Sequence, residues 1–188
     1  MDQSASYLKG HFLMAMPSLA DPNFEKSVTC ISEHTDEGAV GIVVNQVHEG
    51  LSAAMVFSEL GIACGPQADL TPIHIGGPVH TNQLFVLHGP PLEWEASLHI
   101  TPDLGMSNSR DILEAIALEK GPPMYLISLG CAGWAPGQLE WEVTRNTWLT
   151  MPCKLDIIFK VPLENRWETA IRNLGIDPSH LSDTGGFA

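Results

Sequence analysis

The sequence has few positive charges and no long apolar run. Nine lysines and arginines stand against 22 aspartates and glutamates, so the formal charge of the 188-residue chain is −13. Basic side chains supply most of the non-specific affinity of proteins for nucleic acids through phosphate contacts, and this acidic chain is therefore not expected to bind DNA or RNA directly. The same charge disfavours anionic membrane surfaces.

The sequence also shows neither a membrane-spanning segment nor the apolar core of a signal peptide. No stretch approaches the ~18 apolar residues of a membrane span. The apolar run 12–16 is too short for the core of a signal peptide. We therefore expect a cytoplasmic protein.

The common catalytic and cofactor motifs are absent. The four cysteines form no C-x-x-C pair, and the eight histidines show no H-E-x-x-H or H-x-x-x-H spacing. There is no phosphate loop, no G-x-G-x-x-G fingerprint and no G-x-S-x-G elbow. We expect the cysteines to be buried as small hydrophobic residues, and we expect no metal and no cofactor.

Enough apolar residues are present to fill a core. Hydrophobic residues make up 44% of the chain, and its length suits one domain, or one core with a smaller lobe. The pattern predicts a mixed α/β or α+β domain, in which helices flank a largely covered β-sheet and residues 182–188 form a loosely ordered tail. The predicted strands are 27–34, 39–45, 73–77, 83–89, 97–100, 124–129 and 154–161, and the predicted helices are 52–61, 109–121, a helix that begins near Pro136, and 164–175.

The junction "GCAGWAPGQLEWE", residues 130–142, follows the apolar strand 124–129. Its glycine spacing fits neither a phosphate loop nor a dinucleotide fingerprint. We interpret the glycines as a backbone constraint that lets Trp134 fold back over the strand end. A thiolate at Cys131, activated by the following helix, is the alternative for this junction.

The helix after this junction carries side chains on more than one side. Trp141 lies about 200° from Leu139 around the helix, so either a second face is covered or Trp141 meets a partner. Glu140 and Glu142 are only two residues apart and face different directions, so they do not form a catalytic pair.

A shared polar site can be predicted from strand ends. Asn45 ends one apolar strand, and Gln138 opens the helix after another. Ligand crevices of open α/β sheets lie outside the carboxyl ends of strands, so we expect both residues to lie close to the turn at Gly76-Gly77. Their amides can equally tie neighbouring loops together through backbone hydrogen bonds.

Six stretches of the chain form an ordered set of motifs. They are "GHFLMAMPSLADPNFEKSV", "EHTDEGAVGIVVNQ", "HIGGPV", "LFVLHG", "GCAGWAPGQLEWEVTRNTWL" and "WETAIRNLGID". In this order they resemble the YqgE/AlgH family of bacterial proteins. The resemblance runs from about residue 10 to 178 and implies a compact α/β fold. One branch of the family is named as a regulator of alginate synthesis, which implies a role in transcriptional regulation; no catalytic residues are implied.

Two functional hypotheses follow from these observations. The first is a non-enzymatic regulatory or interaction protein that acts indirectly, through a protein or small-molecule partner. The alternative is an enzyme or a small-ligand-binding protein. A deep polar pocket would favour the second hypothesis, and an apolar patch that includes Trp141 would favour the first. The candidate binding residues are His34, Asn45, Gly76, Gly77, Trp134 and Gln138.

Overall fold

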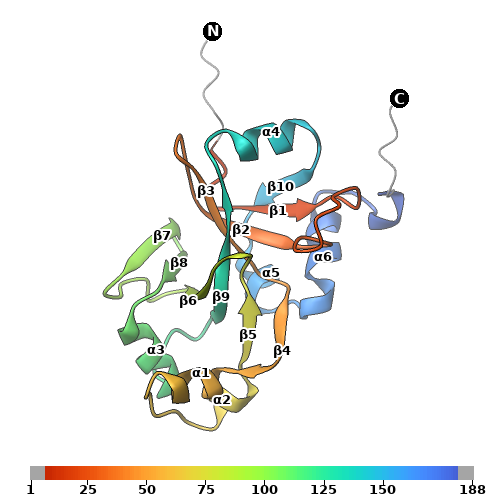
Figure 1. Cartoon of the computed structure of the whole chain (residues 1–188). Coiled ribbons are helices and arrows are strands. Elements are labelled where there is room, and N and C mark those ends of the chain that lie inside the picture. Colours follow the sequence, from red (N-terminus) through yellow and green to blue (C-terminus); the bar gives the residue numbers. More distant parts are fainter. Residues whose placement is uncertain (1–6, 182–188) are drawn as a thin grey trace.

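The computed structural model describes residues 7–181 and shows a curled, mostly antiparallel sheet surrounded by helices (Figure 1). The predicted mixed fold, a largely covered sheet flanked by helices, is confirmed. The predicted tail, 182–188, lies outside the described residues. The strands are β1 (His11–Ala15), β2 (Val28–Thr35), β3 (Gly38–Val43), β4 (Val47–Ser52), β5 (Pro72–Ile75), β6 (Val79–His88), β7 (Ser97–Thr101), β8 (Leu104–Ser107), β9 (Tyr125–Trp134) and β10 (Trp148–Pro152).

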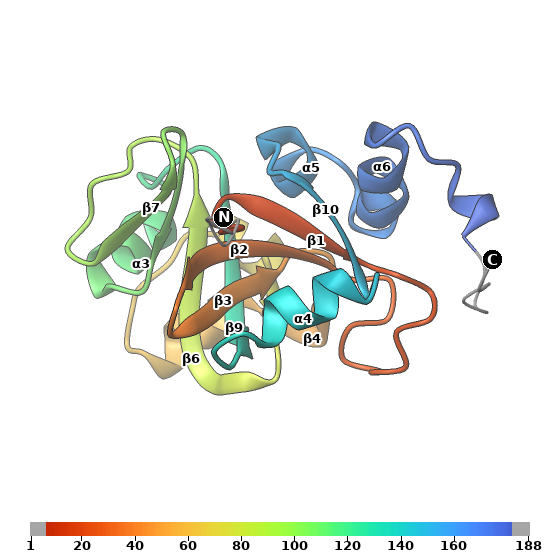
Figure 2. The ribbon, with the colours of Figure 1, turned by 90° about the horizontal axis from the view of Figure 1, so that it is seen from above.

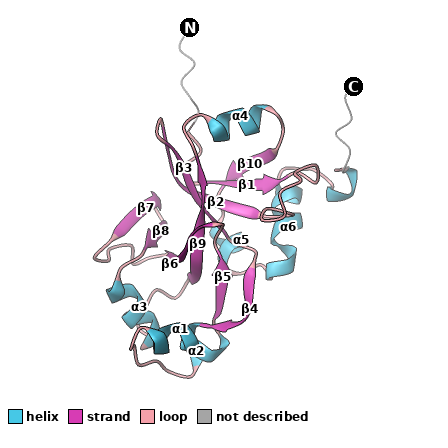
Figure 3. Cartoon of the chain, in the orientation of Figure 1, coloured by secondary structure: helices cyan, strands magenta, loops and turns pink. Residues whose placement is uncertain are grey.

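The helices gather in three places around the sheet (Figure 3). No helix among residues 7–181 is both long enough and apolar enough to cross a membrane. The helices are α1 (Ala53–Glu59), α2 (Gln67–Leu70), α3 (Arg110–Ala117), α4 (Gln138–Thr144), α5 (Leu155–Phe159) and α6 (Arg166–Asn173), with short 3₁₀ turns at Leu163–Asn165 and Pro178–His180.

Three hydrophobic cores correspond to these three groups of helices. The α6 core lies between α5, α6 and one face of the sheet, and it includes Trp167 and Ile171. The α3 core lies between α1–α3 and the strands β5, β6 and β9. The α4 core joins Leu139 of α4 to the other face of β1–β3. Figure 2 shows β1–β3 between α4 on one side and α5 and α6 on the other.

Strand β9 holds the sheet together because it changes neighbours along its length. The sheet order is β10-β1-β2-β3-β9-β6-β8-β7, with β5 also pairing β9 and β4 pairing β5. Residues 127–129 pair with β5 in parallel, whereas residues 132–134 pair with β3 in the antiparallel sense. Strand β6 pairs with β9 in the antiparallel sense between residues 125 and 131. Two sets of strands are thereby joined through one continuous segment.

Gly130 lies at the point where β9 changes neighbours. Its φ of +75° is a conformation that side chains rarely adopt. Before it, Leu126 faces the α6 core and Ile127 the α3 core; after it, Cys131 faces the α6 core and Ala132 the α4 core. The glycine therefore breaks the strict two-residue alternation of the strand and lets one strand serve three cores.

Two further glycines cross β9 at the same point. A Cβ atom on Gly76 would lie 2.1 Å from the Gly130 carbonyl oxygen, and one on Gly77 would lie 2.3 Å from the backbone of Cys131. The Gly76 N–H donates to Leu129 O at 2.8 Å, and its carbonyl accepts from Val43 N–H at 2.8 Å. Backbone thus packs directly on backbone where β3, β5 and β9 meet.

One predicted strand is a helix in the structure. Residues 154–161, predicted as a strand, contain the helix α5, Leu155–Phe159. The β-branched and aromatic residues suggested a strand, but Ile157 and Ile158 are both buried in the α6 core, which strict alternation across a half-exposed strand would not allow. Lys160 and Asp156 form an ion pair at 2.7 Å with the four-residue spacing of a helix. Tertiary burial therefore overrides local strand propensity here.

We predict that replacing Gly130 with alanine lowers the free energy of unfolding by about 3–5 kcal/mol. The added Cβ would lie 2.5 Å from Gly77 O, which adds the cost of overpacking to that of a left-handed backbone. Gly50→Ala is the matched control, since Gly50 has a φ of +74° with no atom within 4 Å of an added Cβ. It should cost only about 1–2 kcal/mol in urea unfolding. Equal losses of unfolding free energy in the two variants would mean that the backbone around Gly77 shifts to make room for the added Cβ.

Candidate functional site

The junction after β9 folds into a polar and aromatic cluster at one end of the sheet. Trp134, the last residue of β9, pairs with Ala39 at the start of β3. The chain then turns through Gly137, whose φ is +74°, and enters α4. Helix α4 packs over the tip of the β2–β3 hairpin and against β10 (Figure 2). The motif that stood out in the sequence therefore forms a layer over this end of the sheet.

Glu142 is the centre of this cluster. Its Oε2 atom accepts hydrogen bonds from the indole N–H of Trp134 at 3.0 Å and from that of Trp148 at 2.8 Å. Its Oε1 atom accepts from the amide of Gln138 at 2.8 Å. Since a carboxylate strengthens each bond it accepts, one charged side chain fixes two large aromatic rings and the first turn of α4.

The two tryptophans belong to a packed aromatic group. Their ring centroids are 6.1 Å apart, and Phe24 packs against both, at 6.2 Å from Trp134 and 5.5 Å from Trp148. Trp134 is 7% exposed and belongs to the α4 core. The interpretation that Trp134 folds back over the strand end agrees with this geometry.

Gln138 closes the turn that precedes its own helix. Its Oε1 atom accepts from Ala135 N–H at 2.9 Å, while its amide donates to Glu142. Both polar atoms of the side chain therefore have partners inside the motif. This is the loop-tying role that the sequence left open beside the ligand-binding role.

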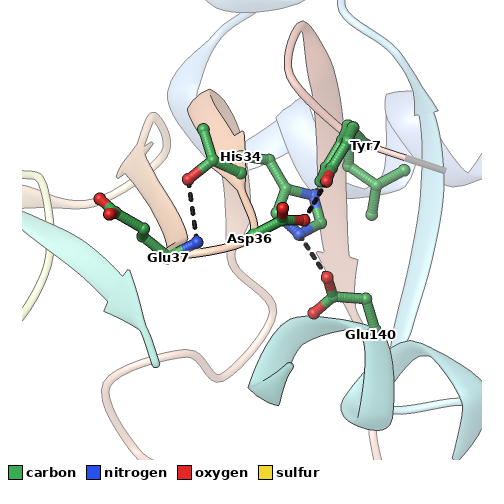
Figure 4. Close-up of polar contacts among 7 residues, drawn as sticks. Tyr7, His34, Asp36, Glu37 and Glu140 are labelled. Atoms are coloured by element: carbon green, nitrogen blue, oxygen red, sulfur yellow. Dashed lines mark hydrogen bonds and ion pairs between the residues drawn. The ribbon is translucent and has the colours of Figure 1, made fainter. Parts of the chain in front are cut away.

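His34 lies on the same end of the sheet, with its side chain 1% exposed. Its Nδ1 atom accepts from Leu8 N–H at 2.9 Å, which places the ring proton on Nε2. Nε2 then donates to Glu140 Oε1 at 3.1 Å (Figure 4). The Tyr7 ring and the imidazole form a T-shaped pair with centroids 5.3 Å apart, and the Tyr7 hydroxyl donates to Asp36. Both ring nitrogens are thus engaged within the fold.

The predicted common site of Asn45 and Gln138 does not form. Trp134, near Gln138, pairs with Ala39 at the start of β3, whereas Asn45 follows its last residue, Val43. Six residues of strand span about 20 Å. The prediction assumed parallel strands, whose carboxyl ends meet at one edge; β3 and β9 run antiparallel, so their carboxyl ends lie at opposite edges.

Asn45 lies instead near the point where Gly76 and Gly77 cross β9. Gly76 bonds to Val43, two residues before Asn45, and Gly77 follows directly. The Asn45 carboxamide accepts from Val28 N–H at 2.8 Å and donates to Lys26 O at 2.8 Å. The six candidate binding residues therefore form two groups: Asn45, Gly76 and Gly77 at the crossing, and His34, Trp134 and Gln138 at the α4 end.

A shallow groove adjoins the second group. It has a volume of about 390 Å³ and is lined by hairpin residues, by Val79 and by the end of β9. Glu33 and Glu37 line it, so its wall is acidic. Of the six candidate binding residues, Trp134 alone lines it.

Metal binding and thiol chemistry are two other activities that the histidines and cysteines of the sequence could support. Among residues 7–181, no group of three or more histidine, cysteine, aspartate or glutamate side chains is placed to hold a metal ion. Cys131 is 3% exposed, and burial raises the pKa of its thiol, which disfavours the nucleophilic thiolate. Burial likewise lowers the pKa of His74 to about 3, so this histidine is neutral near pH 7.

Sequence reasoning missed one feature of the cluster and left a second one open. The role of Glu142 was not predicted, because the residues that it joins are scattered along the chain; the signal available was three tryptophans within 15 residues around an acidic helix. Trp141 does not lie on a second covered face: its side chain is 59% exposed, with the Arg145 guanidinium 4.6 Å from its ring centroid. Of the two alternatives from the sequence, the one in which Trp141 meets a partner stays a prediction.

Two tryptophans of this motif give a matched test of the cluster. Trp134→Ala should lower the free energy of unfolding by about 3–5 kcal/mol, because it removes a buried ring and leaves Glu142 short of a donor. Trp141→Ala should change it by less than about 0.5 kcal/mol, as for exposed positions. Urea denaturation measures both. A loss under ~1 kcal/mol for Trp134→Ala would contradict the packing role.

Comparison with known proteins places this architecture in a family. A family model described as AlgH-like matches residues 12–179. A UPF0301 protein of Desulforapulum autotrophicum is 47% identical over 99% of this chain and 98% of its own length. A UPF0301 protein of Saccharophagus degradans is also 47% identical, over 96% of this chain and 89% of its own length.

Solved structures agree in fold. The solution structure of the AlgH protein from Pseudomonas aeruginosa is similar with a TM-score of 0.80 and 43% identity, covering 100% of both chains. A crystal structure from Corynebacterium diphtheriae has a TM-score of 0.70 over 92% of this chain and 90% of its own, at 22% identity, and supports the fold alone. Together with the ordered motifs and the helix-covered sheet, these likenesses establish that the chain belongs to the AlgH-like family.

Proposed function

We propose that this protein is a non-enzymatic interaction protein of the bacterial cytoplasm that regulates indirectly, by binding a protein partner through the outer face of α4. The observation that carries the proposal is Trp141. Its ring is 59% exposed on α4, and the Arg145 guanidinium stacks over it at 4.6 Å. Tryptophan and arginine are the residue types that most often dominate the energy of protein interfaces.

The polar groups around Trp141 support the same proposal. The side chains of Glu142, Gln138 and His34 form hydrogen bonds with partners inside the fold. These bonds hold α4 on the sheet and orient Trp141 outward. A rigid helix that presents an aromatic side chain needs little further ordering when it binds, which favours affinity.

The chemistry of α4 indicates the kind of partner. Arg145 is exposed and makes no ion pair within residues 7–181, although the chain as a whole carries a charge of −13. A partner segment with an apolar side chain beside a carboxylate would pack on Trp141 and pair with Arg145. Charge complementarity of this kind sets orientation and the rate of encounter.

A small-ligand site is the second candidate, and the groove of about 390 Å³ beside Trp134 favours it. Its acidic wall suits a cationic ligand. Mass spectrometry of the natively purified protein separates the two candidates, because a bound metabolite would appear there without any protein partner. An enzyme acting in this groove would have to use the carboxylates of Glu33 and Glu37 or the hydroxyl of Thr35, because the residues that line it include no histidine, cysteine or lysine.

Any effect on transcription should be indirect. We predict that the purified protein does not bind duplex DNA at ~150 mM salt, because its charge of −13 repels phosphate. Fluorescence anisotropy with random and promoter duplexes measures this. Micromolar or tighter binding to either duplex would contradict the prediction.

Loss of the exposed Trp141 ring should strongly reduce capture of the partner. With tagged protein in a lysate of the source bacterium, Trp141→Ala and Arg145→Glu should each reduce the specifically captured protein at least ~10-fold, as for interface hot spots. Leu70→Ala is the control, because Leu70 is 76% exposed on α2, far from α4 in Figure 1. Quantitative mass spectrometry measures the amount of protein captured by each variant.

The proposal fails if all three variants capture the same proteins as the wild type, or if Leu70→Ala alone reduces capture. It also fails if the wild-type protein captures no partner. In each case α4 would carry no interaction surface for a protein of this bacterium.

A further inference from the structure

Residues Tyr7–Lys9 are held against the body of the protein by a hydrogen bond that only a neutral histidine can make. The Leu8 N–H donates to Nδ1 of His34 at 2.9 Å. The opposite nitrogen of the ring donates to Glu140 at 3.1 Å. With one nitrogen accepting and the other donating, the ring is fixed as the neutral Nε2–H tautomer.

Protonation would reverse the role of Nδ1. An imidazolium donates from both nitrogens, so the Nδ1 proton would face the Leu8 N–H proton, and neither donor would have an acceptor. The His34 side chain is 1% exposed, so water has little access to replace the lost bond. The Nε2 bond to Glu140 survives protonation, because a carboxylate accepts from either form. Only the bond to the N-terminal residues depends on the neutral ring.

Two further contacts of Leu8 do not involve the His34 ring: its carbonyl oxygen accepts from the His11 N–H at 3.0 Å, and its side chain packs against the α4 core. Asp36 accepts from the Tyr7 hydroxyl, and this bond is the largest cause of the raised pKa of that hydroxyl. It is solvent-exposed, however, and bonds of this kind contribute little. Glu37 points away from the ring (Figure 4). The charged and titratable groups that face His34 are thus Tyr7, Asp36 and Glu140.

We propose that residues Tyr7–Lys9 form a proton-controlled latch: protonation of His34 breaks the Leu8 bond and releases these residues from the β2–β3 hairpin and α4. Leu8 packs against the α4 core, so its release uncovers apolar surface beside α4. The latch is independent of the proposed partner surface, because it rests on contacts within this chain alone.

Amide hydrogen exchange of Leu8, followed by NMR, tests the latch. Protection factors correct for the intrinsic effect of pH, so the comparison is between pH 7.5 and pH 5.0. We expect the protection of Leu8 to fall about tenfold or more at pH 5.0, in line with the loss of one buried hydrogen bond. Protection of Val44, whose N–H donates to Val28 O at 2.8 Å inside the fold, should not change.

Variants assign the effect to His34. His34→Asn places an amide oxygen near the position of Nδ1, and that oxygen accepts from Leu8 without being protonated in this range, so the pH step should disappear. Tyr7→Phe removes the bond to Asp36 but leaves His34, so the step should remain. If the asparagine variant does not fold, the ¹⁵N shifts of the wild-type imidazole decide instead.

Those shifts must report an unprotonated Nδ1 at pH 7.5 and a protonated one at pH 5.0, over the same pH range as the loss of Leu8 protection. The latch is refuted if the ring stays neutral at pH 5.0. It is refuted equally if the ring titrates while Leu8 stays protected, or if His34→Asn keeps the full pH step.

Discussion

The whole sheet depends on a close crossing of bare backbone. Gly76 and Gly77 pass over β9 at Gly130, where added Cβ atoms would approach backbone atoms to between 2.1 and 2.5 Å. This crossing lets β9 leave β5 and pair with β3, and it turns the strand so that its side chains reach three cores. Side chains of any size would separate the segments and break the hydrogen bonds that Gly76 makes to Leu129 and Val43.

Much of the architecture follows from sequence patterns, and the failures have physical causes. The hairpin of β2 and β3, the helix α3 and the buried strand β9 were predicted because their apolar periodicity is strong. The glycines of the junction were correctly read as a backbone constraint. Helix α5 was mistaken for a strand, since burial in the α6 core outweighs its β-branched composition. Local pattern cannot report which core a short apolar segment will join.

The positions of the candidate site residues were also hard to predict, because they depend on how distant strands pair. The amides of Asn45 and Gln138 were identified as polar groups that need partners, and each has them, but their separation depends on whether β3 and β9 run parallel or antiparallel. Sequence does not encode strand direction locally. Glu142 was missed for a related reason: its partners Trp134 and Trp148 come from two different strands, which only the fold brings to one carboxylate.

The central position of β9 also has a consequence for biosynthesis. Strands β3, β5 and β6 are each completed by a segment that the ribosome makes only after all three have emerged, and β1 waits longer still for β10. Until then the nascent chain exposes unpaired strand edges, which are prone to associate with other chains. A chain that stops before residue 125 lacks the strand that joins its two halves. Chaperones that bind extended apolar segments would therefore find their substrate in the growing chain rather than in the finished protein.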